Sequence, residues 1–141
     1  MSTEDNKDIV RRFTEGMIEY IRTGNLDPLL DTLHPDAAFD MPGMPPTLDG
    51  MKQVIPAFRT AFPDLHVTVG EMIADEDKVA YRITWTGTHK GEFMGIPATG
   101  KRVTVTETHI DQIANGKIVQ HVGDWDQMGM MQQLSVIPSM G

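Results

Sequence analysis

The sequence predicts an α+β domain in which three N-terminal helices pack on one face of a curved antiparallel sheet. Apolar residues recur at intervals of three or four as far as Pro63, which is typical of amphipathic helices, and at intervals of two after it, which is typical of strands. A length of 141 residues suits one domain with its own core, so residues 1–141 are predicted to form a single domain.

Two helices are expected before residue 36. The first runs from Asp8 to Thr23 and ends at Gly24; its apolar face consists of Ile9, Phe13, Met17, Tyr20 and Ile21. Asp27 and Pro28 then mark the N-cap and the first turn of a short second helix. This helix stops at His34-Pro35, because the residue before a proline is pushed out of the helical region.

A third helix is expected from Met51 to Phe62, where apolar residues again recur at helical spacing before Pro63. The segment before it, residues 36–50, is rich in proline and glycine and is predicted to be an irregular rim. Phe39 and Met41 in this rim are candidates to line the mouth of a pocket, since methionine adapts to irregular gaps and to ligands.

Four strands are expected in the second half, at residues 65–74, 78–89, 102–113 and 117–126. Short polar turns between most of them predict an antiparallel meander, with a longer loop at residues 90–101. Asp126 stands where an N-cap is expected before a last helical segment, residues 128–134.

Composition narrows the function classes. Twelve basic residues against twenty acidic ones give a net charge of −8, which argues against nucleic acid, because binding to it requires neutralisation of phosphates. No apolar run approaches the roughly 20 residues of a membrane span, so no membrane partner is expected. The absence of cysteine excludes disulfides and thiolate catalysis and fits a reducing compartment, so we expect a cytoplasmic protein.

Most of the plausible chemistry lies in residues 102–126, where six ionisable residues fall in or beside strands: Glu107, His109, Asp111, His121, Asp124 and Asp126. Carboxylates and histidines in such surroundings are typical of acid/base catalysis. The chain has no GxSxG sequence and no cysteine, which excludes the common nucleophilic sites. His109 and His121 with a carboxylate could form a facial metal triad, but no HxH or HxxxH spacing supports it, and no metal is predicted.

The turn between the last two strands decides which of these side chains share a face. If Asn115-Gly116 is a two-residue type I′ turn, Ala114 pairs with Lys117, and Asp124 lies on the same face as His109.

If the loop has three residues instead, Ile113 pairs with Lys117 and His109 sits opposite His121. Asp124 then points to the other face of the sheet.

The chain resembles the SnoaL-like polyketide cyclases of the nuclear-transport-factor-2-like superfamily. The resemblance covers nearly the whole chain and is most specific in three segments: residues 87–101, residues 116–121 and residues 129–134. It implies a cone-shaped sheet that encloses an apolar cavity with the helices, and a homodimer. It also implies a cofactor-independent aldol cyclisation of a hydrophobic, polyketide-like substrate.

The site residues of the family carry over only in part. His109 matches the family histidine, but the family aspartate is expected two residues after the histidine matched by His121, where this chain has Gly123. Asp124 lies one place late, and only a bulge at Gly123 would turn it inward. The family pattern favours the three-residue loop. The candidate catalytic residues are therefore His109, Asp124, His121 and Glu107.

For an apolar substrate, aromatic and methionine side chains are the expected contacts: Phe39, Met41, Phe58, Phe62, Trp85, Met94 and Trp125. Two alternatives to a cyclase remain. One is a non-catalytic domain that binds a small molecule or pairs with another chain. The other is an activity like that of limonene epoxide hydrolase, whose Asp-Arg-Asp arrangement is weakly echoed by Arg82 with Asp111 or Asp124.

Overall fold

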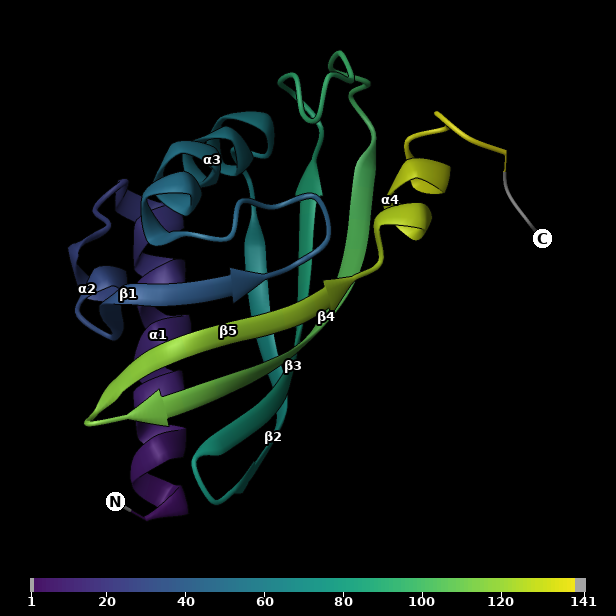
Figure 1. Cartoon of the computed structure of the whole chain (residues 1–141). Coiled ribbons are helices and arrows are strands. Elements are labelled where there is room, and N and C mark those ends of the chain that lie inside the picture. Colours follow the sequence, from purple (N-terminus) through teal and green to yellow (C-terminus); the bar gives the residue numbers. More distant parts are fainter. Residues whose placement is uncertain (1, 139–141) are drawn as a thin grey trace.

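The computed structural model describes residues 2–138 and has the α+β architecture that the sequence predicts. A curved five-stranded sheet, in the order β1-β5-β4-β3-β2, packs against the N-terminal helices and is not closed into a barrel (Figure 1). The elements in chain order are α1 (Thr3–Thr23), α2 (Asp27–Leu30), β1 (Leu33–Asp40), α3 (Leu48–Ala61), β2 (His66–Asp75), β3 (Lys78–Thr88), β4 (Arg102–Ala114), β5 (Lys117–Trp125) and α4 (Gln127–Gln133).

The helix α1 starts one turn earlier than the apolar pattern predicts, because Ser2 and Asp5 form a capping box. The Ser2 hydroxyl accepts the Asp5 N–H at 3.0 Å, and the Asp5 carboxylate accepts the Ser2 N–H at 3.0 Å. The helix ends at Gly24 in a left-handed conformation, as expected. Within residues 2–138, no helix has the length and apolar character needed to cross a membrane.

The strand β1 corrects the prediction that residues 36–50 are irregular throughout and that the sheet is purely antiparallel. It runs parallel to β5, so the sheet is mixed. Its pairing is interrupted between Leu33 and Ala38, around Pro35, which has no N–H for a regular ladder. Ala37 and Phe39 are buried on its inner side.

The other pairings, β2 with β3, β3 with β4 and β4 with β5, are antiparallel as predicted. The last hairpin closes through a two-residue turn, since Ala114 pairs with Lys117 and both Asn115 and Gly116 have positive φ. This is the first of the two turn geometries considered above.

A bulge then changes the register, so that neither predicted register holds along the strands. Gln112 pairs with Gln120 although Ile113 pairs with Ile118, which leaves Val119 as an extra residue on β5. His109 consequently sits opposite Gly123. His121 points inward and Asp124 outward.

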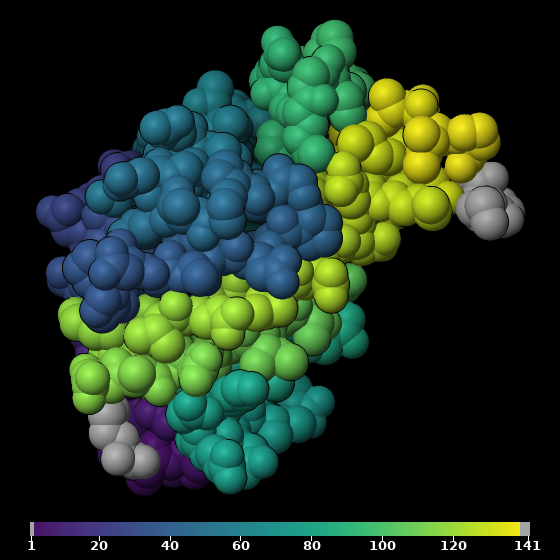
Figure 2. All heavy atoms as spheres, viewed as in Figure 1, coloured from purple at the N-terminus to yellow at the C-terminus, as the bar shows by residue number. Residues whose placement is uncertain are grey.

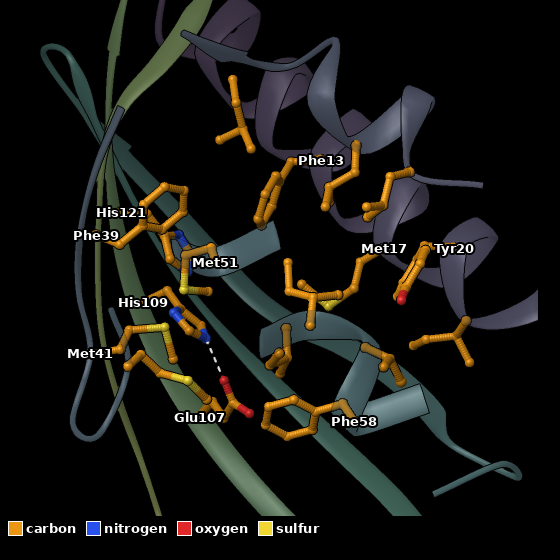
Figure 3. A pocket seen from close by; sticks show the side chains of 18 of the residues that line it. Phe13, Met17, Tyr20, Phe39, Met41, Met51, Phe58, Glu107, His109 and His121 are labelled. Atoms are coloured by element: carbon orange, nitrogen blue, oxygen red, sulfur yellow. Dashed lines mark hydrogen bonds and ion pairs between the residues drawn. The ribbon is translucent and has the colours of Figure 1, made fainter. Parts of the chain in front are cut away.

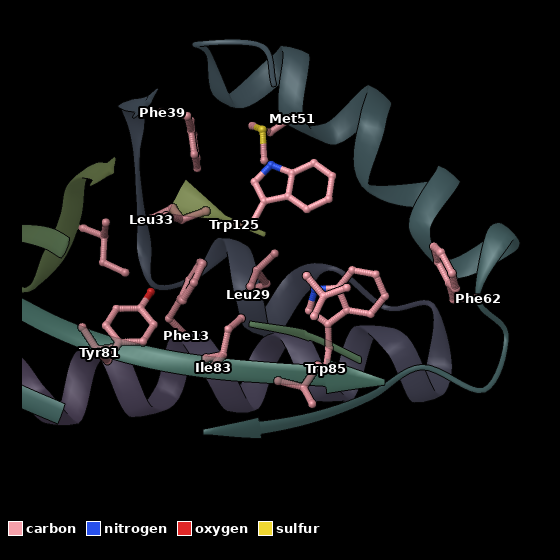
Figure 4. Close-up of a cluster of buried hydrophobic side chains, with 14 of the residues drawn as sticks. Phe13, Leu29, Leu33, Phe39, Met51, Phe62, Tyr81, Ile83, Trp85 and Trp125 are labelled. Carbon is pink, nitrogen blue, oxygen red and sulfur yellow. The ribbon is translucent and has the colours of Figure 1, made fainter. Parts of the chain in front are cut away.

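The core lies between the helices and the inner face of the sheet. Phe13 from α1, Leu29 from α2 and Phe39 from β1 face Ile83 and Trp85 of β3 across it (Figure 4). In the space-filling view, the chain from α2 to α3 lies directly against β5 on the visible face (Figure 2). The helices α1 to α3 therefore cover the inner face of the sheet, and β1 extends the sheet beside β5.

Asp126 caps α4, as the sequence predicts: its carboxylate accepts the Gly129 N–H at 2.9 Å. Met130 and Leu134 of this segment are buried in the core, so α4 is expected to unfold together with the rest of the domain.

We expect Asp126→Ala to lower the free energy of unfolding by about 1 kcal/mol, measured by urea denaturation. Removal of the exposed Glu92 carboxylate, in the loop between β3 and β4, by Glu92→Ala is the control and is expected to change it by less than about 0.5 kcal/mol. Equal effects of the two substitutions would contradict a capping role.

Candidate active site

A cavity of about 130 Å³ lies between α1, α3 and the inner face of the sheet. Its wall is mainly apolar and includes four methionines: Met17, Met41, Met44 and Met51. The carboxylate and imidazole groups that line it come from the strands: Glu107, His109 and His121. They face Phe13, Met17 and Tyr20 of α1 across the cavity (Figure 3). Lys52 and Arg59 of α3 add two cations to the wall.

The first polar cluster joins Trp85, Glu107 and His109. The Trp85 indole N–H donates to Oε2 of Glu107 at 2.7 Å, and Nε2 of His109 lies 2.8 Å from Oε1 (Figure 3). Both carboxylate oxygens are thus fixed by neighbours on β3 and β4. Since an ionised carboxylate only accepts hydrogen bonds, Nε2 of His109 carries the proton in this contact.

The second cluster joins Tyr81, Asp111 and His121, all three of which are buried, with no exposed surface on Asp111. The Tyr81 hydroxyl donates to Oδ2 of Asp111 at 2.8 Å, and Nδ1 of His121 lies 2.5 Å from Oδ1. Burial raises the pKa of Tyr81 well above its usual range, and the negative charge of Asp111 raises that pKa further. The phenol therefore remains a donor at neutral pH.

The two histidine rings are stacked, which joins the two clusters. Their centroids are 4.6 Å apart with an angle of 21° between the planes. The His109 ring lies over Gly123, where a Cβ would approach its Nδ1 to 2.2 Å. That Nδ1 is buried and has no hydrogen-bond partner. The absence of a side chain at residue 123 is therefore what makes room for the His109 ring.

Among the predicted contact residues, five line the cavity: Phe39, Met41, Phe58, Trp85 and Trp125. Two do not. Phe62 is fully buried beside the rings of Trp85, His89 and Phe93, and Met94 is 44% exposed in the loop between β3 and β4.

The structure brings three of the four predicted catalytic residues to the cavity, namely Glu107, His109 and His121. Asp124 is exposed on the outer face of the sheet, because the register pairs it with Thr108. Arg82 is also exposed, whereas Asp111 is buried on the inner face. No Asp-Arg-Asp arrangement of these residues therefore faces the cavity. Across residues 2–138, no three His, Cys, Asp or Glu side chains are arranged to hold a metal ion.

Asp111 and Tyr81 are polar members of the site that the sequence analysis did not assign to it. Alternation along β4 was the available signal, since a strand that turns His109 inward also turns residue 111 inward. Asp111 was named among the six ionisable residues of this segment, but the one specific role considered for it was as a partner for Arg82. Its contact with His121 depends on the bulge at Val119, which no sequence pattern indicated.

A family model for SnoaL-like polyketide cyclases matches residues 8–134. Aklanonic acid methyl ester cyclase DnrD of Streptomyces peucetius is 31% identical over 135 residues, which cover 90% of this chain and 88% of the relative. Nogalonic acid methyl ester cyclase of Streptomyces nogalater is 29% identical over 128 residues, which cover 84% and 91%.

Solved structures agree with this similarity. AclR of Streptomyces galilaeus, to which a hydroxylase activity has been ascribed, superposes with a TM-score of 0.84 at 28% identity, over 99% of this chain and 91% of that chain. IdmH of Streptomyces antibioticus gives a TM-score of 0.76 at 31% identity, over 92% and 98%.

The packing of His109 over Gly123 makes a steric prediction. Gly123→Ala is expected to lower the free energy of unfolding by about 1–3 kcal/mol, because the new methyl group overlaps the His109 ring and forces it to move. Urea denaturation measures the change. Gly70→Ala, also within a strand but with its nearest neighbour 3.4 Å from the added Cβ, is the control and is expected to be tolerated. His109→Ala combined with Gly123→Ala should remove the clash, so additive losses would contradict the assignment.

Proposed function

Because the chain belongs to the SnoaL-like polyketide cyclase family, we propose that it closes a ring in a hydrophobic, polyketide-like carbonyl compound by acid/base chemistry. The observation that carries this proposal is the carboxylate of Glu107, held by Trp85 and His109 at the wall of an apolar cavity. An aldol ring closure begins with removal of a proton next to a carbonyl, which requires a base in a fixed position.

Glu107 is the base in this scheme, in the place of the aspartate that the family resemblance implies at residue 123. Its two oxygens each accept one hydrogen bond and keep further lone pairs free to accept a proton, and the residue lines the cavity. The indole of Trp85 and the imidazole of His109 fix its orientation and stabilise its negative charge. The steps call only on protein side chains, so the proposed reaction needs no metal or organic cofactor.

The apolar wall suits a flexible substrate that must be held folded for attack. The cavity of about 130 Å³ is smaller than the roughly 300–1,000 Å³ of typical ligand pockets, so the wall must move when a polycyclic compound binds. Its methionines have three rotatable side-chain bonds each and are suited to this change. Binding is therefore expected to rearrange side chains such as Met41 and Met51 (Figure 3).

Substitution of the base tests the proposal. Glu107→Gln keeps the shape and the contact with Trp85 but removes the charge, so we expect kcat to fall by about 10²–10⁴-fold with little change in KM. The assay uses aklanonic acid methyl ester, nogalonic acid methyl ester and a panel of aromatic β-keto compounds, with the ring-closed product measured by chromatography. Asp75→Asn, an exposed carboxylate at the end of β2, is the matched control with unchanged turnover.

The non-catalytic alternative gives the opposite result. A binding domain would show saturable binding of these compounds and no ring-closed product from any of them. Full activity of Glu107→Gln would remove Glu107 from the chemistry even if the wild-type protein is a cyclase.

We also propose that the protein forms a homodimer through the outer face of the sheet. An apolar row crosses four adjacent strands there, since Ile73 pairs with Ala80, Ala80 with Ile110, and Ile110 with Val122. Ile73 and Ile110 are 59% and 46% exposed. Such a row fits an apolar surface on a second copy.

A neighbouring row of paired residues on the same outer face supports a two-fold arrangement of the two copies. Arg82 and Asp124 lie at opposite ends of it, each paired with Thr108. A two-fold axis along β4 brings Arg82 of one copy over Asp124 of the partner subunit, so both ends are matched in charge.

Ile110→Lys is expected to convert the dimer to a monomer, because it places two like charges close to the two-fold axis. Sedimentation velocity measures the mass. Ile18→Lys, on the 42% exposed Ile18 of α1, is the matched control and should leave the dimer intact. A wild-type protein that sediments as a monomer at all concentrations would exclude this arrangement.

A further inference from the structure

The cluster of Tyr81, Asp111 and His121 is not used by the reaction proposed above, although its histidine lines the same cavity. The three side chains come from three adjacent strands, β3, β4 and β5. They repeat the order of the first cluster: an aromatic donor, a carboxylate and an imidazole. Asp111 has no exposed surface and His121 is 4% exposed.

A buried carboxylate with two donors is a costly feature for a cavity wall. An ionised carboxylate loses favourable hydration on burial, and Asp111 regains part of that stabilisation through its hydrogen bonds with Tyr81 and His121. Apolar residues of similar size generally stabilise such a position as well or better. Titratable groups in this arrangement are concentrated at functional sites.

The contact with Asp111 fixes the orientation and the tautomer of His121. Since the carboxylate accepts, Nδ1 donates to it, and Nε2 is the ring nitrogen at which protons are gained and lost. The neighbours of the ring on the other elements are aromatic: Phe13 of α1 at 5.3 Å and Phe39 of β1 at 5.8 Å between centroids. The titratable neighbours are Asp111 and His109, with Tyr81 and Glu107 behind them.

We propose that His121, positioned by Asp111 and Tyr81, protonates the acceptor carbonyl oxygen during ring closure, while Glu107 removes the α-proton. This assignment rests on the cyclase function proposed above. His121 stacks on His109 with 4.6 Å between the ring centroids, and Nε2 of His109 lies 2.8 Å from Oε1 of Glu107. One imidazole ring therefore separates the acid from the base. A carbanion and a carbonyl folded together in the cavity would then meet both groups.

The C–H bond next to one carbonyl breaks, and its proton passes to Glu107. The electron pair forms the new C–C bond to the second carbonyl carbon, whose oxygen takes the proton from Nε2 of His121 and becomes a hydroxyl group. Glu107 has then gained one proton and His121 has lost one, and exchange with water restores both after the product leaves.

The first test removes the negative charge of Asp111, which contacts Nδ1 of His121. Asp111→Asn keeps the size but removes the anion that stabilises the imidazolium, so kcat with aklanonic acid methyl ester or another turned-over compound of the panel is expected to fall by about 100-fold, with KM nearly unchanged. Tyr81→Phe removes one hydrogen bond to Asp111 and should lower kcat by about tenfold. The control is His66→Gln, at the exposed start of β2.

The second test needs no substrate, and its main measurement uses the wild-type protein. Nitrogen NMR of the wild-type protein should show a proton on Nδ1 of His121 at every pH, with gain and loss of a proton at Nε2. In folded Asp111→Asn, this preference for Nδ1 should weaken. If Asp111 had only a structural role, Asp111→Asn would not lower kcat selectively over KM and would not change the pH profile of turnover.

The outcomes separate the two proposals. A wild-type protein that turns over no compound of the panel overturns the cyclase function and the acid role together. Turnover that is unaffected in both Asp111→Asn and Tyr81→Phe overturns the acid role alone. If Asp111→Asn does not fold, the turnover of Tyr81→Phe and the NMR spectrum of the wild-type protein test the acid role instead. A spectrum in which Nε2 of His121 carries the proton and Nδ1 carries none contradicts the assignment.

Discussion

The packing of the His109 imidazole over Gly123 is the contact on which the rest of the site depends. Any side chain at residue 123 would occupy the volume that the ring fills, since even a Cβ would come within 2.2 Å of Nδ1. From this position the ring reaches Glu107 with Nε2 and stacks on His121. The family resemblance implies an aspartate at residue 123, on the last strand. Here the carboxylates of the site come from β4, as Glu107 and Asp111.

One extra residue in β5 determines which faces of the sheet carry His121 and Asp124. With the observed two-residue turn and no bulge, His109 would pair with Val122, and Asp124 rather than His121 would point inward. Val119 shifts the register by one, so that His121 meets Asp111 and Asp124 faces outward. The bulge is consistent with burial, because the alternative would place a carboxylate in the apolar cavity and expose Trp125.

The sequence predicted the fold class, the helices α1 to α3, the four later strands and the Asp126 cap, because each has a local periodic or capping signal. It failed where the cause is not local. The strand β1 contains Pro35 and finds its parallel partner some 80 residues later, so no nearby pattern marks it. The turn at Asn115-Gly116 was one of the two geometries that the sequence left open, but the bulge at Val119 depends on tertiary burial. Phe62 was grouped with the contact residues because its helical stripe cannot show which members face a cavity and which face the core.

The double arrangement of donor, carboxylate and imidazole bears on the choice between chemistry and simple binding. A pocket that only holds an apolar compound gains nothing from one buried and one partly buried carboxylate, because apolar side chains would stabilise the domain equally well and bind the compound better. Each carboxylate here has its own aromatic donor and its own histidine, which keeps both groups in fixed positions before a substrate arrives. Fixed dipoles and charges of this kind lower the energy of a transition state in which charge moves, since they need no reorganisation during the reaction. The proposed proton transfer accounts for the polar wall of this cavity, which affinity for an apolar compound alone does not.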